Sequence, residues 1–327
     1  MNRLKISHFD NGSNKELFSL LKLEYHTLST DFWDWRFNQN EFGSPIQYGA
    51  WDDNKLVGYH IVQPIPMKVQ NNVEKILFSM ATITHPDYRG QGIAEKLGKQ
   101  VYDKATELGY RMVIGFPNQN SKNLFFKKLN WINLGNILEF EKSIEKCNKI
   151  NSRNLKIYEI NNFDEKTNRI WDLNKNNYEF IVERNSDFLN WRYVMAPKCG
   201  VRIEPTTEYS CFILEEDGKP ETYFVIKKYG KDNAHIVDLF GKLTEKILDE
   251  IISFSIEFCV KHKILNLSIW SDFNSTQKNL FSILENNGFT KKISDKFRGM
   301  CIFDNDLKNI MTKENNWYFS MGDCDVY

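Results

Sequence analysis

The sequence predicts an α/β (α+β) protein of two tandem domains, each a mixed, mostly antiparallel sheet flanked by helices with one parallel strand–helix–strand crossover. The first observation behind this prediction is an internal repeat, because residues 31–37 (Asp-Phe-Trp-Asp-Trp-Arg-Phe) match residues 187–193 (Asp-Phe-Leu-Asn-Trp-Arg-Tyr). A second motif, Lys-Asn-Leu-Phe, begins at Lys122 and again at Lys278, at the same spacing of 156 residues. Since two separate motifs share one spacing, we expect each half of the chain to be one copy of the same fold.

The elements at the start of the first copy follow from apolar periodicity and turn residues. A helix is expected at 14–27, where three leucines share one face, and Asp31 is expected to be the N-cap of a short helix. Two short apolar runs at 48–51 and 56–64 flank the turn sequence Asp-Asp-Asn, which predicts a β-hairpin.

The second observation behind the fold class is a crossover pattern in the same copy. A strand is expected at 75–84, a helix from about 93 to 108 that ends at Gly109, and another strand at 111–116. A strand–helix–strand connection of this kind implies a parallel pair inside the sheet. The copy is expected to close with a helix and a strand, at 121–129 and 137–143.

Composition excludes several classes of function. Lys and Arg together number 43, as do Asp and Glu, so the expectation is no nucleic acid and no anionic membrane as the main partner. No apolar run approaches the roughly 18 residues that cross a bilayer, and the N-terminus lacks the apolar segment of a signal peptide. The six cysteines form no Cys-x-x-Cys pair. We therefore expect free thiols in a reducing cytoplasm, without a metal site or a disulfide framework.

The boundary between the two copies is expected in the polar stretch 145–154, which has no apolar period. This places the first domain at residues 1–148 and the second at residues 149–327. The oligomeric state is not indicated, and a monomer or a homodimer is expected.

The sequence from Thr82 to Ala94 (Thr-Ile-Thr-His-Pro-Asp-Tyr-Arg-Gly-Gln-Gly-Ile-Ala) joins the expected strand to the expected helix. Glycines let a backbone approach an anion closely, and the first turn of a helix offers unpaired N–H groups and a positive dipole end. The alternative is an Arg-Gly turn that caps an ordinary helix. Arg89-x-x-Gly92-x-Ala94 resembles the pyrophosphate loop of the GNAT superfamily of N-acetyltransferases, whose pattern is Gln/Arg-x-x-Gly-x-Gly/Ala.

The resemblance implies two tandem GNAT-like domains and acetyl-CoA, or another acyl-CoA, as co-substrate without a metal. In the family the strands on either side of the loop separate, and the pantetheine arm lies between them, here between 80–84 and 112–116. Asn118 and Ser121 either hold this arm or cap the next helix. The residues implied to bind acyl-CoA are Ile83, Thr84, Arg89, Gly90, Gln91, Gly92, Ile93, Ala94, Asn118 and Ser121.

The chemistry requires a base that removes a proton from the acceptor amine. The leading candidates are His85, Asp323 and Asp325, with Glu24, His26 and His60 as further ones. The ending Gly-Asp-Cys-Asp resembles that of two-lobed GNAT proteins from bacterial surface-polysaccharide gene clusters, which implies that the tail returns to the cleft between the copies. Phe126 stands where the family often has a Tyr that protonates the leaving thiolate. Either another group is the acid or the acid step is dispensable.

The second copy lacks the glycine loop. At the spacing of 156, Glu245, Leu248 and Glu250 stand opposite Arg89, Gly92 and Ala94. Two acids near a helix N-terminus would repel a pyrophosphate. We therefore predict one acyl-CoA site, in the first copy, with a degenerate second copy that shapes the acceptor cleft. The Trp-Arg pairs at 35–36 and 191–192 are interpreted mainly as packing anchors, and Arg36 is a minor candidate for acceptor binding.

The resemblance thus implies a bacterial, cytoplasmic N-acetyltransferase that transfers an acyl group to a small-molecule amine acceptor by direct attack on the thioester. An amino sugar or a nucleotide-linked amino sugar is the first expectation for that acceptor. An alternative is an aminoacyl transferase of the Fem type, which has paired GNAT-like lobes but does not generally need the glycine loop. A third alternative is a non-catalytic CoA-binding or scaffold protein.

Overall fold

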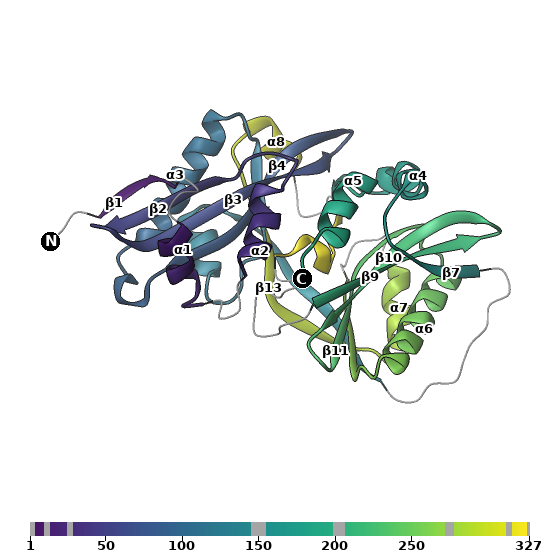
Figure 1. The fold of residues 1–327 in the computed structure, drawn as a ribbon. Coiled ribbons are helices and arrows are strands. Elements are labelled where there is room, and N and C mark those ends of the chain that lie inside the picture. The colour runs from purple at the N-terminus through teal and green to yellow at the C-terminus, as the bar shows by residue number, and fades with distance from the viewer. Residues whose placement is uncertain are drawn as a thin grey trace.

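The structure is a computed structural model that describes residues 4–9, 14–24, 29–144, 155–198, 207–271, 278–311 and 316–325 of the chain. Figure 1 shows two halves side by side, the first in purple and blue and the second mainly in green. The C-terminal end lies between the halves, whereas the N-terminal end lies at the outer edge of the first half. The C-terminal end of the chain therefore lies near the middle of the molecule.

The first half contains the hairpin, the crossover and the closing strand that the sequence predicts. Its strands are β1 (Lys5–His8), β2 (Ile46–Asp52), β3 (Lys55–Val69), β4 (Asn72–Thr84), β5 (Met112–Gly115) and β6 (Ile132–Ser143). Its helical segments are α1 (Asn14–Leu21), α2 (Thr30–Trp33), η1 (Asp34–Asn38), η2 (Pro86–Tyr88), α3 (Ile93–Glu107) and η3 (Leu124–Lys128).

The second half repeats this order and adds a C-terminal tail. Its strands are β7 (Leu155–Ile160), β8 (Phe180–Val182), β9 (Thr207–Glu216), β10 (Lys219–Tyr229), β11 (Asn233–Gly241), β12 (Asn266–Ser271), β13 (Thr290–Ile302) and β14 (Trp317–Tyr318). Its helical segments are α4 (Glu165–Asn174), η4 (Lys175–Asn177), α5 (Ser186–Leu189), η5 (Asn190–Val194), α6 (Glu245–Lys261), α7 (Lys278–Asn286), α8 (Asn305–Ile310) and η7 (Met321–Asp323).

The strands of the described residues form one continuous sheet in the order β1-β2-β3-β4-β5-β13-β6-β12-β11-β10-β9-β7. Most neighbours are antiparallel, and β4–β5 and β11–β12 are the parallel pairs that α3 and α6 connect. The predicted fold class is therefore confirmed. The last long strand of each half pairs with the other half, since β13 lies against β5 and β6 lies against β12. In Figure 1 the yellow β13 and α8 accordingly reach into the blue half.

The repeat is visible in the backbone as well as in the sequence. Helix α2 begins at Thr30 and α5 at Ser186, and π-helical segments follow at Asp34 and Asn190, at the same spacing of 156. The division of the chain at residue 148 stays a prediction, because residues 145–154 lie outside the described residues.

Two local expectations were wrong. The N-cap of α2 is Ser29, whose side chain accepts a hydrogen bond from the backbone of Phe32, whereas Asp31 lies in the first turn. Asn185 caps α5 at the equivalent position, which the repeat could have revealed. Helix α1 ends at Leu21, earlier than residue 27, and residues 25–28 lie outside the described residues.

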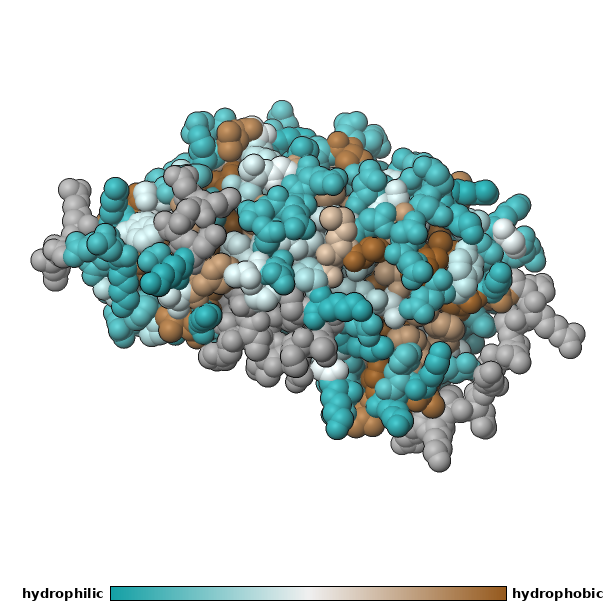
Figure 2. All heavy atoms as spheres, viewed as in Figure 1, coloured by the Kyte–Doolittle hydropathy of each residue, from teal (hydrophilic) through white to brown (hydrophobic). Residues whose placement is uncertain are grey.

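The surface mixes hydrophilic and hydrophobic side chains. On the face shown in Figure 2, hydrophobic side chains form small patches separated by hydrophilic ones. Among the helices that the structure describes, none is both long and apolar enough to cross a membrane.

Candidate functional site

The neighbouring strands β4 and β5 separate after a short parallel contact. They pair only at Leu77–Val113 and Phe78–Ile114, while β4 continues to Thr84. A bulge in β4 accompanies the separation, because between the pairs His60–Thr82 and Val62–Ser79 one residue of β3 lies opposite two of β4. A cavity of about 120 Å³ opens there, lined by Ser79, Met80, Thr82, Phe116, Pro117, Asn118, Ser121, Phe125, Trp131, Asp295, Lys296 and Asp325. The separation of these strands, which the resemblance implied, is present.

The glycine loop leaves the N-terminus of α3 open. Gly90 and Gly92 have φ of +80° and +72°, a conformation that favours glycine, and a Cβ at either position would meet no atom within 4 Å. Gly92 is the N-cap of α3 and supplies no side-chain hydrogen bond to the helix. The first backbone N–H groups of α3 therefore have no side-chain cap, and the dipole adds positive character where they point. This geometry suits an anion.

The side chains around the loop stabilise it rather than fill it. The Nε atom of Arg89 donates to the carbonyl oxygen of Thr84 at 3.2 Å, and its guanidinium pairs with Glu24. Gln91 is exposed and Ala94 is half-buried, whereas the side chain of Ile93 is buried against Gly58 of β3. Through the backbone, these residues position the N–H groups of the first helical turn.

The end of β4 has polar groups without partners. The side chain of Ile83 is buried, and Ile83 pairs with Tyr59 on the β3 side. The Thr84 Oγ1 and Ser79 Oγ atoms are buried and have no hydrogen-bond partner among the described residues. Buried hydroxyls are normally hydrogen-bonded, so such atoms beside a cavity mark a place where a ligand can complete the bonding.

Asn118 and Ser121 fulfil the capping interpretation and also line the cavity. The Oδ1 atom of Asn118 accepts a hydrogen bond from the backbone of Ser121 at 3.0 Å, and the Asn118 backbone donates to Ser121 Oγ at 3.0 Å. Both residues lie on the cavity wall. The two interpretations of this turn are thus compatible.

The three leading candidates for the base do not lie together. His85 accepts a hydrogen bond from the backbone of Asp87 at 3.3 Å and packs edge-on against Tyr88. It faces a different pocket, which it lines with Leu20 of α1. The structure therefore places His85 away from the cavity between β4 and β5.

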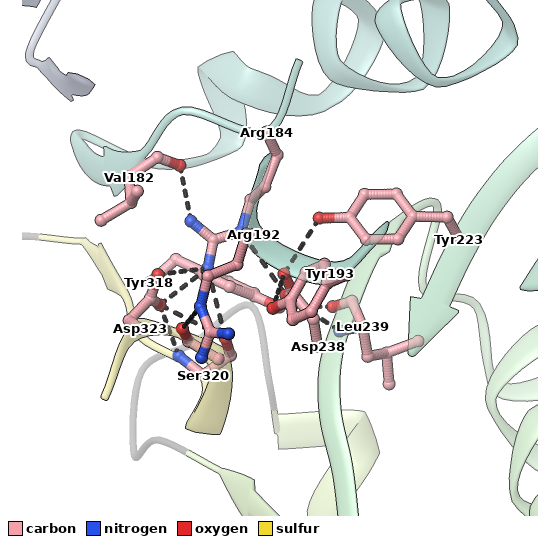
Figure 3. Close-up of polar contacts among 11 residues, drawn as sticks. Val182, Arg184, Arg192, Tyr193, Tyr223, Asp238, Leu239, Tyr318, Ser320 and Asp323 are labelled. Atoms are coloured by element: carbon pink, nitrogen blue, oxygen red, sulfur yellow. Dashed lines mark hydrogen bonds and ion pairs between the residues drawn. The ribbon is translucent and has the colours of Figure 1, made fainter. Parts of the chain in front are cut away.

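Asp323 is part of a buried ionic network. Figure 3 shows both of its oxygens against the Arg184 guanidinium, at 2.8 and 2.7 Å, and Asp238 lies 3.5 Å from Arg184 Nε. Burial opposes the charge of Arg184, but Asp238 and Asp323 outweigh burial and hold the pKa of its guanidinium well above the ordinary value. Asp323 accordingly anchors the tail to the second half, and it does not line the cavity.

Asp325, two residues further along the tail, is half-buried and lines the cavity. The tail that carries it is held by β14, which pairs with β8, and by η7. The tail is therefore ordered and brings one carboxylate of the second half to the strand gap of the first half.

Sequence reasoning missed Thr82 of β4 as a cavity residue. Its hydroxyl lies 2.5 Å from Nδ1 of His60 on β3. Burial lowers the pKa of His60 to about 3, so its imidazole is neutral. The alternation of β4 could have indicated that Thr82 and His60 share one face of the sheet, but not that this face reaches a cavity.

Phe126 lies outside the cavity, and its ring packs edge-on against Phe297 of β13. Its neighbour Phe125 lines the cavity instead. The position at which the family often has Tyr is thus part of the contact between the halves.

The Trp-Arg pairs lie at the centre of the molecule. Trp35 and Trp191 stack with ring centroids 5.3 Å apart, and Trp35 Nε1 donates to the Trp191 carbonyl oxygen at 2.8 Å. Both rings are buried in one hydrophobic core that spans the two halves. Their interpretation as packing anchors is confirmed.

Within the described ranges, no group of three or more His, Cys, Asp or Glu side chains could hold a metal ion.

Residues 6–132 match the acetyltransferase (GNAT) domain family, in the half that contains the glycine loop and the cavity. This part of the chain therefore matches a GNAT acetyltransferase domain, and the resemblance to the superfamily is confirmed. No curated protein matches the chain by sequence.

Solved structures share the fold over more than 90% of this chain. A conserved protein of unknown function from Enterococcus faecalis V583, designated a probable N-acyltransferase, has TM-score 0.70 and 14% identity over 92% of this chain and 73% of its own. A GCN5-related N-acetyltransferase from Anabaena variabilis has TM-score 0.66 and 14% identity, covering 91% and 72%. N-myristoyltransferase of Saccharomyces cerevisiae, with bound myristoyl-CoA and inhibitors, has TM-score 0.62 and 10% identity, covering 93% and 80%. At these identities the likeness establishes the fold.

Proposed function

We propose that this protein is an acyl-CoA-dependent N-acyltransferase, with acetyl-CoA as donor and the amine of a small molecule as acceptor. The observations that carry the proposal are the cavity between β4 and β5, with Asp325 in its wall, and the N-terminus of α3, which follows β4 in the chain and has no side-chain cap. This arrangement combines a place for an anion, a place for an extended chain and a carboxylate for proton transfer.

The residues present fit acyl-CoA. The backbone of residues 90–95 would hold the pyrophosphate, since the glycines leave open space in front of the helix N-terminus. Beyond Phe78 the edge of β4 that faces β5 has no strand partner among the described residues, so its main-chain groups are available to an amide-containing chain. Ser79 Oγ supplies a further unpartnered polar atom there. When bound, acyl-CoA would supply an activated acyl thioester.

Asp325 is the proposed proton acceptor. The amine nitrogen forms a bond to the acyl carbon, the carbon–sulfur bond breaks, and the proton lost from nitrogen passes to Asp325 while the thiolate leaves. A thiol of pKa about 8.5 is a good leaving group, so the absence of a Tyr at Phe126 does not prevent the step. His85 and Asp323 are not part of this proposal, because neither lines the cavity.

The acceptor is proposed to be an amino sugar or a nucleotide-linked amino sugar, on the resemblance of the tail to polysaccharide-cluster proteins. In this proposal the first domain binds acyl-CoA, and the second domain shapes the acceptor cleft and delivers Asp325. The Fem-type alternative is less well supported, because an open glycine loop suits an anion. A non-catalytic CoA-binding protein is the remaining alternative.

The test is acetyl-CoA-dependent thiol release across a panel of amines, with wild type, Asp325→Asn and Asp295→Asn. Asp295→Asn is the matched control, because Asp295 lines the same cavity but pairs with Lys296 at 3.2 Å. We expect Asp325→Asn to lower kcat by about 100-fold or more, the ordinary contribution of a general base, and Asp295→Asn to change it less than about 3-fold. Tight binding of acetyl-CoA without thiol release from any amine would favour the non-catalytic alternative.

A further inference from the structure

Among the residues that the structure describes, Arg36 is a buried cation without a carboxylate partner. It is 4% exposed, on the short segment η1, and its guanidinium lies over the rings of Trp35 and Trp191 at 5.5 and 5.1 Å. Its Nε atom contacts the sulfur of Met80 at 3.5 Å. Among the described residues, no Asp or Glu lies within ion-pair distance of Arg36, although buried charges are normally paired.

Other cations surround Arg36 and make this region strongly positive. Burial and the neighbouring Arg192 lower the pKa of Arg36 to about 9, and Asp325 opposes this only in part. Burial raises the pKa of Tyr209, but Lys227, Arg192 and Arg36 outweigh burial and bring it down to about 8. A phenol whose proton is weakened in this way reports a positive potential, which an anion would relieve.

Arg36 is not among the residues that line the cavity, but it lies directly behind the cavity wall. Arg36 contacts Met80 and interacts at longer range with Asp325, and both of these residues line the cavity. Arg192, the repeat equivalent of Arg36, is held differently, because its Nε donates to the Gly322 carbonyl oxygen at 2.9 Å and its Nη1 to Tyr209 at 3.2 Å. Arg192 therefore fixes the tail, whereas Arg36 has no such bond.

Resting on the proposed acyl transfer, we infer that Arg36 binds an anionic group of the acceptor, so the substrates are amines that carry a carboxylate or a phosphoryl group. A guanidinium matches both groups with paired, charge-assisted hydrogen bonds. Asp325 then faces the amine and Arg36 the anion, so the two ends of the acceptor are distinguished by charge. A neutral amino sugar lacks the second contact, whereas a phosphate-bearing one provides it.

The test compares acceptors that differ only in the anion. D-Glucosamine is compared with D-glucosamine 6-phosphate, and β-alaninamide with β-alanine, so the two pairs distinguish a phosphoryl from a carboxylate subsite. In wild type we expect kcat/KM to favour the anionic member of one pair by about 10- to 100-fold, the ordinary effect of a hydrogen bond to a charged group. In Arg36→Met the preference should fall below about 3-fold with acetyl-CoA binding unchanged, and Arg36→Lys should keep part of it.

Lys296→Met is the matched control, since Lys296 is another cation at the cavity but pairs with Asp295. It should leave the preference intact. The inference fails if wild type shows no preference in either pair, if the preference survives Arg36→Met, or if Lys296→Met removes it instead.

A binding measurement separates this inference from the proposed function. Inorganic phosphate and acetate are compared with chloride at equal ionic strength, and the Tm is measured for wild type and Arg36→Met. If the anions raise the Tm of wild type but not of Arg36→Met, and no amine gives thiol release, the anion subsite is retained and the proposed acyl transfer is rejected. If amines give thiol release without a preference for the anionic acceptor, acyl transfer is retained and the anion subsite is rejected. Arg36→Met should fold at least as stably as wild type, because it removes a buried unpaired charge.

Discussion

The two halves of the molecule differ at the gap where their two parallel strands stop pairing. In the first half the gap beyond the β4–β5 contact is a cavity, and the hydroxyl of Ser79 in its wall has no partner among the described residues. In the second half β11 and β12 pair up to Ile236–Ile269, and the C-terminal tail packs against the part of β11 beyond that pair. A Cβ on Gly322 of the tail would collide with Tyr193 and lie 3.2 Å from the Val237 carbonyl oxygen, so this packing is close.

The helix that follows the gap differs as well, because its N-terminus is open in the first half and capped in the second. The N-terminus of α3 begins at Gly92 without a side-chain cap, whereas Thr244 caps α6 by accepting a hydrogen bond from the Ile247 backbone at 3.3 Å. Gly241, the glycine nearest to α6, is packed against the Glu221 carbonyl oxygen, while Gly90 faces open space. One half thus retains an opening for a ligand, and the other fills it with its own chain and becomes the support for Asp325.

The filled gap should matter most for stability. Asp323→Asn removes one partner of the buried Arg184 and is expected to cost about 3–5 kcal/mol of unfolding free energy, because a buried charge loses its compensation. Urea unfolding measures this, with Asp172→Asn as the control, since the exposed Asp172–Lys175 pair should contribute less than about 1 kcal/mol. Equal effects of both variants would mean that the tail is not anchored by Asp323.

The open gap should matter most for acetyl-CoA binding. Gly92→Glu places a side chain and a negative charge in front of α3 and should weaken binding about 100-fold or more, through steric and electrostatic exclusion of the pyrophosphate. Gly109→Glu is the matched control, since Gly109 has φ +81° and equally open surroundings at the opposite end of α3. Calorimetry should give one acetyl-CoA per chain. A stoichiometry of two would show that the second half also binds acetyl-CoA and that its gap is not filled.

One buried histidine in each half should make stability depend on pH. The pKa values of His60 and His235 are both lowered from 6.5 to about 3, mainly by burial. Each is neutral when folded and charges on unfolding, so the stability is fully present above pH 6.5 and is lost as pH falls toward 3. At pH 5 the loss should be roughly 2 kcal/mol for each histidine. Unfolding of His60→Gln and His235→Gln from pH 8 to 5 should each show about half of the wild-type slope.

The cap of α6 should have the smallest effect. Thr244→Ala is expected to cost about 1 kcal/mol, the usual value of an N-cap, without changing acetyl-CoA affinity. Thermal unfolding and calorimetry on the same variant measure both quantities. A change in affinity would show that the second half takes part in acetyl-CoA binding after all.

Much of the fold followed from local patterns in the sequence. The hairpin of β2 and β3, the β4–α3–β5 crossover and the helix end at Gly109 depend on neighbours within a few residues, and they occur close to the expected positions. The N-cap of α2 was misplaced because Ser29 and Asp31 are both good capping residues and only the backbone conformation selects one.

Part of the candidate site could likewise be predicted from the sequence, and part could not. The loop from Arg89 to Ala94 is a contiguous motif, so its residues could be named from the sequence. Arg36 meets Met80 only when η1 packs against β4, and Asp325 reaches the same cavity only through the folded tail, so no short-range pattern brings them together. His85 adjoins the loop in sequence, yet the direction of its side chain takes it to another pocket.

The sequence by itself determined the repeated fold, the open glycine loop and the loss of that loop in the second half, because each depends on residue types at fixed short spacings. The tertiary structure alone decided that β6 and β13 cross between the halves, that the tail fills one gap, and that Asp325 rather than Asp323 faces the other. These outcomes depend on contacts between residues far apart in the sequence, such as Tyr318 with Leu239 at 79 positions and Arg184 with Asp323 at 139 positions. Burial, packing volume and charge pairing select such contacts as the chain folds, and short-range sequence patterns do not encode them.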